Sequence, residues 1–65
     1  MERLIRRDEV EKIVFDHDQD WIIVYFLREE NPIRLKKEDY PNLQKGDWVN
    51  ITQTHRGGER RVRSI

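Results

Sequence analysis

The chain has 65 residues, 40% of them charged, and its 13 basic and 13 acidic side chains give a formal net charge of zero. A chain of this length forms a single domain and has little room for an enclosed pocket. It contains no cysteine, which excludes disulfides and thiolate metal sites and favours a reducing compartment.

The apolar segments are short. The longest run, residues 21–27, has seven residues, far fewer than the roughly 20 that a membrane-spanning helix needs. Charged side chains interrupt residues 1–7, which therefore lack the apolar core of a signal peptide. We expect a cytoplasmic protein without a membrane partner.

The N-terminal third predicts one strand and one turn. Residues 1–8 fit a short edge strand, a frayed helical turn or a flexible arm. Residues 9–15 alternate between two faces and predict a strand with Ile13 and Phe15 toward the core. The acidic residues 16–20 contain no apolar side chain and predict a hairpin turn to the next strand.

The uncharged stretch 21–27 predicts the central strand, because it is rich in β-branched and aromatic side chains. Successive residues of a strand face opposite sides, so both rows of this strand are apolar. Both of its faces are therefore expected to be covered, with Ile22, Val24 and Phe26 in the core. Residues 28–32, which end in a proline, are a turn signal.

A third strand and a loop follow. Residues 33–36 alternate cleanly and predict a half-exposed strand with Leu35 inward. Residues 37–43 fit no strand. We expect a short 3₁₀ turn or loop there, held to the core by Tyr40 and Leu43.

The C-terminal third predicts a hairpin. Residues 48–54 form its first strand, with Val49 and Ile51 inward, and residues 60–65 form its second strand, with Val62 inward. The glycine pair between them permits the positive φ angles of a tight turn. The second strand has few inward residues and is expected at an edge of the sheet.

Short strands at close spacing, separated by turn signals and without any helix-length periodic segment, predict an all-β domain spanning residues 1–65. We expect a small five-stranded antiparallel barrel, SH3-like or OB-like. Closure into a barrel would also remove exposed strand edges.

Aspartates at every second position, Asp16, Asp18 and Asp20, suggest a calcium loop. An EF-hand loop needs a glycine at its sixth position and a glutamate at its twelfth, where this chain has Trp21 and Leu27. The motif fails, and a solvated hairpin turn is the expected role.

Other catalytic and ligand motifs are also incomplete. His17 and His55 lack a third metal ligand at a diagnostic spacing, and no serine or cysteine lies in a nucleophile setting. The pair Gly57-Gly58 precedes a β segment rather than a helix, which favours a hairpin over a phosphate-binding loop. We expect no enzymatic activity, no metal and no cofactor.

The charges are unevenly distributed along the chain. Residues 1–20 carry seven acidic and four basic side chains, whereas residues 21–65 carry nine basic and six acidic ones. Much of the basic excess lies in the C-terminal hairpin, and arginine both donates paired hydrogen bonds to phosphate and stacks on bases. A solvated edge strand whose charges prevent aggregation is the alternative explanation.

We predict that a nucleic-acid-binding patch is centred on this hairpin. Other basic side chains join it around the barrel, and surface aromatic rings add stacking to a single-stranded ligand. The candidate residues are Arg56, Arg60, Arg61, Arg63, Lys45, Arg34, Lys36, Trp48 and Tyr25. Tyr40 is a further aromatic side chain that we expect partly at the surface.

Between residues 10 and 54 the chain has a fixed order of features. A strand, an acidic turn and an apolar strand that begins with an aromatic residue span residues 14–27, and a short charged strand follows at residues 33–35. A proline-containing segment, Tyr40-Pro41, and a Gly-Asp pair before the next strand, within residues 45–49, complete the order. In this order the chain resembles a family of small bacterial domains of unknown function, in which leucine usually stands at the position of Tyr40. The resemblance implies a small β-barrel and no catalytic residue.

A second outline is a long central strand at 21–27, Gly46-Asp47 before the strand 48–51, and a basic final hairpin at 56–63. In this outline the chain resembles the oligonucleotide-binding barrels of the S1 and bacterial initiation-factor-one type. Their surface aromatic residues and the glycine of their first strand are not evident here. The resemblance implies a barrel architecture.

Together these features predict non-enzymatic binding of RNA or single-stranded DNA through phosphate contacts. The alternative is a protein-interaction module, such as a phage or plasmid accessory factor or a subunit of a larger machine. Such a module would use an exposed edge strand or pair with a second copy of itself.

Overall fold

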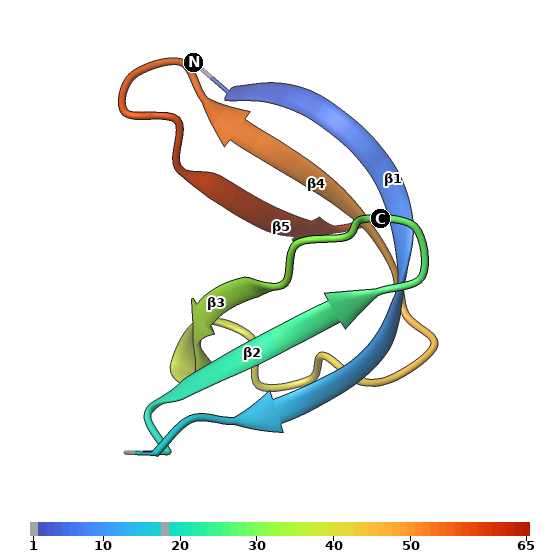
Figure 1. Ribbon diagram of the computed structural model, residues 1–65, viewed down its shortest axis with the longest axis vertical. Coiled ribbons are helices and arrows are strands. Elements are labelled where there is room, and N and C mark those ends of the chain that lie inside the picture. The colour runs from blue at the N-terminus through green and yellow to red at the C-terminus, as the bar shows by residue number, and fades with distance from the viewer. Residues whose placement is uncertain (1, 18) are drawn as a thin grey trace.

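The computed structural model describes residues 2–17 and 19–65 and shows an all-β chain with five strands in one antiparallel sheet (Figure 1). The elements are β1 (Glu2–Phe15), β2 (Trp21–Phe26), β3 (Ile33–Lys36), the 3₁₀ helix η1 (Lys37–Asp39), β4 (Trp48–Thr54) and β5 (Arg60–Ser64). Their order across the sheet is β3-β2-β1-β4-β5. The prediction of an all-β domain with five antiparallel strands is confirmed. Over the described ranges, no helix is long and apolar enough to span a membrane.

The sheet does not close into the predicted barrel. β3 and β5 form its two edges, and no backbone ladder joins them in the described part of the chain. A side chain bridges the gap instead, because Tyr40, just after η1, donates its hydroxyl to the carbonyl oxygen of Val62 at 2.7 Å. The structure is therefore an open, bent sheet whose short edge strands face each other across a bridged gap.

β1 links the two halves of the sheet and curves along its whole length (Figure 1). Residues 2–9 pair with β4 and residues 10–15 pair with β2. One register shift follows Leu4 and another follows Val10, and such bulges bend a strand and increase its twist. Residues 2–8 are extended, but the short edge strand that we considered is not observed, because these residues begin the 14-residue β1 in the middle of the sheet. Residue 1 lies outside the described residues.

The second bulge changes which side chains of β1 enter the core. Val10 is buried and Ile13 is half-buried, although a regular strand would place these two residues on opposite faces. Phe15, which we predicted in the core, is instead 58% exposed. The ammonium of Lys37 lies 4.9 Å from its ring centroid. The predicted alternation is wrong at Val10, because the inserted residue shifts its phase. After the bulge the predicted phase holds, since Ile13 and Phe15 pair with core residues of β2, but Phe15 is the last residue of β1 and stays exposed.

The core lies on the concave side of the bent sheet and draws on all five strands. Its buried apolar residues are Val10, Ile22, Val24, Phe26, Ile33, Leu35, Val49, Ile51 and Val62. Val10 and Ile33 were not predicted, whereas the packing of Tyr40 and Leu43 against this core agrees with the prediction.

Only one face of β2 is fully buried. Trp21, Ile23 and Tyr25 stay half-buried on the outer face, while the alternate residues are buried. The prediction that both faces are covered is wrong, because the single sheet has no second layer over this side. Cations cover the rings in part: Lys12 Nζ lies 4.6 Å from the ring centroid of Tyr25, and Arg34 Cζ lies 4.1 Å from that of Trp21.

Asp8 is a buried carboxylate that ties β1 to the β2–β3 loop. It is 1% exposed. One oxygen accepts the backbone N–H groups of Glu9 at 2.7 Å and Arg28 at 3.2 Å, and the other accepts that of Glu29 at 2.8 Å. A buried carboxylate is costly unless its oxygens are hydrogen-bonded. These three donors therefore make its burial possible and hold the loop against β1.

Replacing Asp8 with alanine should destabilise the fold, because the N–H groups of Arg28 and Glu29 lose their acceptor. We expect Asp8→Ala to lower the free energy of unfolding by about 2–3 kcal/mol, as measured by urea denaturation at neutral pH. Glu11→Ala, at an exposed position of the same strand, is the control and should change it by less than about 0.5 kcal/mol. Equal effects of the two substitutions would contradict the role assigned to Asp8.

Candidate nucleic-acid interface

An open groove of about 810 Å³ lies between the edge strands β3 and β5. We call it the β3–β5 groove. Its lining includes five basic and two acidic side chains, so it is net basic in a chain that is neutral overall. The basic residues are Arg34, Lys36, Arg60, Arg61 and Arg63, and the acidic residues are Asp39 and Glu59.

Most of these basic side chains lie on the outer face of β3 and β5, because alternate residues of a strand face opposite sides. In β3, Arg34 and Lys36 are exposed and alternate with buried aliphatic residues. In β5, Arg61 and Arg63 are exposed on either side of the buried Val62. Because β3 and β5 face each other, cations that are distant in the sequence line one groove.

Two aromatic residues, Trp21 and Tyr40, line the groove, and the predicted site did not include Trp21. Its ring is half-buried on the outer face of β2 and lines the groove beside Arg34 and Lys36. We had expected this ring to be covered. The sequence did contain a signal for this position. Trp21 alternates with Ile22 and Val24 along the strand and therefore faces away from the core, and the next strand presents only basic residues on that same outer face.

Arg34 is held over the ring of Trp21 by an ion pair. Its Nε donates to Oδ2 of Asp16 at 2.8 Å, and Asp16 lies in the β1–β2 turn. The hydrogen bond from Arg34, with a second one from the backbone N–H of His17, lowers the pKa of the Asp16 carboxyl below its usual value of 3.8. The guanidinium is thus positioned between a carboxylate and an indole.

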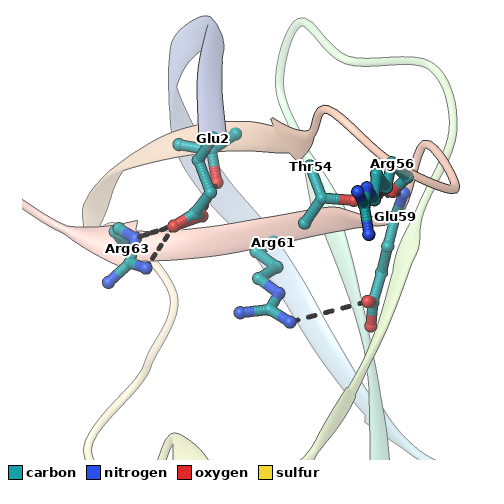
Figure 2. Close-up of polar contacts among 7 residues, drawn as sticks. Glu2, Thr54, Arg56, Glu59, Arg61 and Arg63 are labelled. Atoms are coloured by element: carbon teal, nitrogen blue, oxygen red, sulfur yellow. Dashed lines mark hydrogen bonds and ion pairs between the residues drawn. The ribbon is translucent and has the colours of Figure 1, made fainter.

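Arg63 forms the most extensive ion pair of the site, with Glu2 at the start of β1 (Figure 2). Its Nε donates to Oε2 of Glu2 at 2.9 Å, and its Nη2 contacts the same oxygen. The hydroxyl of Thr52 donates to Oε1 at 2.7 Å. The hydrogen bonds from Arg63 and Thr52 lower the pKa of Glu2 from 4.5 to about 2, and Glu2 in turn raises the pKa of Arg63.

The other two arginines of β5 differ in how firmly they are held. Arg61 contacts Glu59 at 3.6 Å, and both side chains are at least half exposed (Figure 2). Arg60 donates to Glu29 at 2.7 Å, and the Glu29 side chain is only 10% exposed. Glu29 belongs to the loop that Asp8 holds, so the Arg60 contact joins β5 to that loop and is mainly structural.

The remaining predicted site residues do not line the groove. Tyr25 lies on the outer face of β2, farther along the strand than Trp21. Trp48 is 49% exposed at the start of β4. Lys45 is exposed in the turn before β4, and Arg56 is exposed in the β4–β5 turn.

The motifs that we set aside in the sequence remain apart in space. His17 and His55 lie in the β1–β2 and β4–β5 turns, which are at opposite ends of the fold (Figure 1). Gly57 and Gly58 have φ angles of 72° and 64°, as a hairpin turn requires. Asp18 of the aspartate series lies outside the described residues. Within residues 2–17 and 19–65, no group of three or more His, Cys, Asp or Glu side chains is placed to hold a metal ion.

No family model, curated protein or solved structure matches this chain.

The low pKa of Glu2 predicts how stability depends on pH. Because folding lowers this pKa from 4.5 to about 2, the contact stabilises the fold fully above about pH 4.5 and is lost as the pH falls toward 2. Glu2→Gln has no such titration, so its free energy of unfolding should fall less than that of the wild type on acidification. Urea denaturation at a series of pH values from about 6 to about 2.5 measures this difference. Glu11→Gln should retain the wild-type pH dependence, and an unchanged slope in Glu2→Gln would contradict the assignment.

Proposed function

We propose that this protein binds single-stranded nucleic acid, RNA or DNA, in the β3–β5 groove without catalysing a reaction. The observation that carries the proposal is the convergence of Arg34, Lys36, Arg61 and Arg63 beside the half-exposed ring of Trp21. Guanidinium and ammonium groups bind phosphates, and an aromatic ring stacks on a base. A single strand presents both groups at once, whereas a duplex keeps its bases paired and stacked inside.

The ion pairs of the groove are compatible with this proposal. Arg61 and Glu59 are exposed and touch only at 3.6 Å, and the Arg34 side chain is half exposed. Exposed ion pairs contribute little to stability and are screened by salt. A polyanion that contacts several of these cations together can therefore take the place of their carboxylate partners.

The arrangement also supports an OB-like barrel that is left open between β3 and β5. Barrels of that type have five strands, are partly open, and bind oligonucleotides on the face of their second and third strands. Here that face carries Trp21 and Tyr25 from β2 and Arg34 and Lys36 from β3. The loop between strands four and five also contributes to binding in such barrels, and here it contains Arg56.

The alternative of a protein-interaction module has less support at the β5 edge. Addition of a partner's strand needs free backbone groups on an edge strand. On β5 the backbone carbonyl of Val62 already accepts the hydroxyl of Tyr40. A partner strand that paired at this carbonyl would have to displace that contact.

The proposal predicts that a labelled single-stranded oligonucleotide binds with an affinity that falls steeply with salt. Binding releases counterions from the strand, so fluorescence anisotropy should show a large loss of affinity between about 50 mM and about 200 mM salt. The absence of binding at micromolar protein in about 50 mM salt would contradict the proposal. A monomer in sedimentation equilibrium that also fails to bind would point to a separate protein partner.

Substitutions in the groove should separate stacking from phosphate contact. We expect Trp21→Leu to weaken binding about 5- to 100-fold through loss of base stacking. Arg61→Ala should weaken it and lower the salt slope by about 0.7, the value for one phosphate contact on a single strand. Arg3→Ala removes an exposed arginine of β1 outside the groove and is the matched control.

An equal loss in Arg3→Ala and Arg61→Ala would show diffuse charge attraction rather than a site. Lys45→Ala and Arg56→Ala test how far the site extends beyond the groove. A circular dichroism melt of each variant establishes that it remains folded.

A further inference from the structure

The hydrogen-bond donors that surround the carboxylate of Glu2 would also suit a phosphate group. The carboxylate oxygens accept from the guanidinium of Arg63 on β5 and from the hydroxyl of Thr52 on β4. The two donors come from neighbouring strands, and Thr52 is only 7% exposed, so the atoms packed around it restrict the movement of its hydroxyl. The anion is supplied by a third strand, β1.

The donors do not distinguish a carboxylate from a phosphate by their chemistry. A guanidinium presents a planar fork of N–H donors that matches both anions, and a hydroxyl donates to either. The Arg63 side chain is 60% exposed and the Glu2 side chain is 23% exposed, so a ligand can reach Arg63 from solvent. Arg63 also lines the β3–β5 groove.

We propose that Arg63 and Thr52 form a phosphate-binding position at the rim of the β3–β5 groove, and that Glu2 competes for it as a tethered anion. This inference rests on the proposed function. A nucleic acid strand that enters the groove places one backbone phosphate oxygen where Oε1 or Oε2 of Glu2 now lies. The Glu2 side chain swings toward solvent when it is displaced, and no covalent step is involved.

Glu2 differs in this respect from the carboxylates that pair with the other two arginines of β5. The Glu59–Arg61 contact is long, and both side chains are exposed, so it offers little competition. Glu29 is 10% exposed and lies in the loop that Asp8 anchors, so a ligand cannot readily displace it from Arg60. Glu2 alone among these three combines several hydrogen bonds with a position at the solvent-accessible rim.

The test is the affinity of wild-type protein and Glu2 variants for a fluorescein-labelled oligothymidylate of about 12 nucleotides. Glu2→Gln should bind about three- to tenfold more tightly and show a salt slope steeper by about 0.7, because Arg63 becomes free for a phosphate. Glu2→Asp keeps the negative charge, but its side chain is one methylene shorter and cannot reach Arg63 and Thr52 together. It should also bind more tightly than the wild type.

Two matched variants separate release of Arg63 from a simple change in net charge. Glu11→Gln removes one negative charge from an exposed position of β1 and should change the affinity less than about twofold. Adding Arg63→Ala to Glu2→Gln should abolish the gain, because the freed donor is then absent. Circular dichroism melts establish that each variant is folded at the temperature of the titration.

Each outcome decides between the two proposals. If the wild type binds but Glu2→Gln and Glu2→Asp bind no more tightly, the phosphate position is wrong while the groove proposal stands. If Glu11→Gln gains as much as Glu2→Gln, net charge alone explains the effect and the inference fails. If neither the wild type nor any variant binds, both proposals fail. Binding by Glu2→Gln alone would contradict nucleic acid binding by the wild-type protein and, because the inference rests on that function, would contradict the inference as well.

Discussion

The structure depends on one strand that serves both halves of the sheet. β1 pairs first with β4 and then with β2, and its two bulges bend the sheet around a single apolar core. A flat five-stranded sheet of this sequence would leave its apolar face in water. Asp8 lies just before the second bulge, and its carboxylate holds the β2–β3 loop against β1 at this bend. The bulge and the carboxylate together favour a curved sheet over a flat one.

The same bend determines where the groove lies. β3 and β5 are the two ends of the strand order, and the bend turns them toward each other without joining them by a ladder. Exposed edges invite aggregation, and outward arginine and lysine side chains oppose it. The cations of β3 and β5 therefore protect the fold even in the absence of any ligand. Protection does not require the half-exposed Trp21 beside them, and this ring is the reason why we propose a binding groove rather than a charged edge.

Much of the fold could be predicted because local patterns agree with the final structure. The alternation of Ile22, Val24 and Phe26 and of Val49 and Ile51 identified most of the core, and turn residues marked the hairpins. The bulge after Val10 could not be predicted, because no glycine or proline marks it. The alternation of inward and outward residues therefore shifts by one position without any signal in the sequence. Short sequence patterns also could not show whether the barrel closes, because closure depends on the distance between the two edge strands, which lie at opposite ends of the sheet.

The sequence predicted several basic side chains of the candidate site, but it did not predict which acidic side chains pair with them. The outward cations of β3 and β5 follow from strand alternation, whereas Glu2 and Arg63 are 61 residues apart and meet only through the order of three strands. The exposure of Trp21 was missed because both rows of β2 are apolar. The core row of Ile22, Val24 and Phe26 was identified correctly, but the apolar outer row suggested a second covering layer, which the single sheet does not have.

β1 also sets the charge of the groove through its two ends. Glu2 at its start pairs with Arg63 of β5, and Asp16 directly after its end pairs with Arg34 of β3. Two acidic side chains of residues 1–20 thus lie next to arginines of the groove. They are much closer to these cations than the Debye length of about 8–10 Å, so salt only partly screens the attraction. A ligand with one charge meets cations that are already neutralised. Lys36 and Arg61 are held only by exposed contacts of 3.6 Å to Glu38 and Glu59. A strand with several phosphates would gain from these two cations as well as from the displaced pairs, which is why we propose a polyanion rather than a single anion as the ligand.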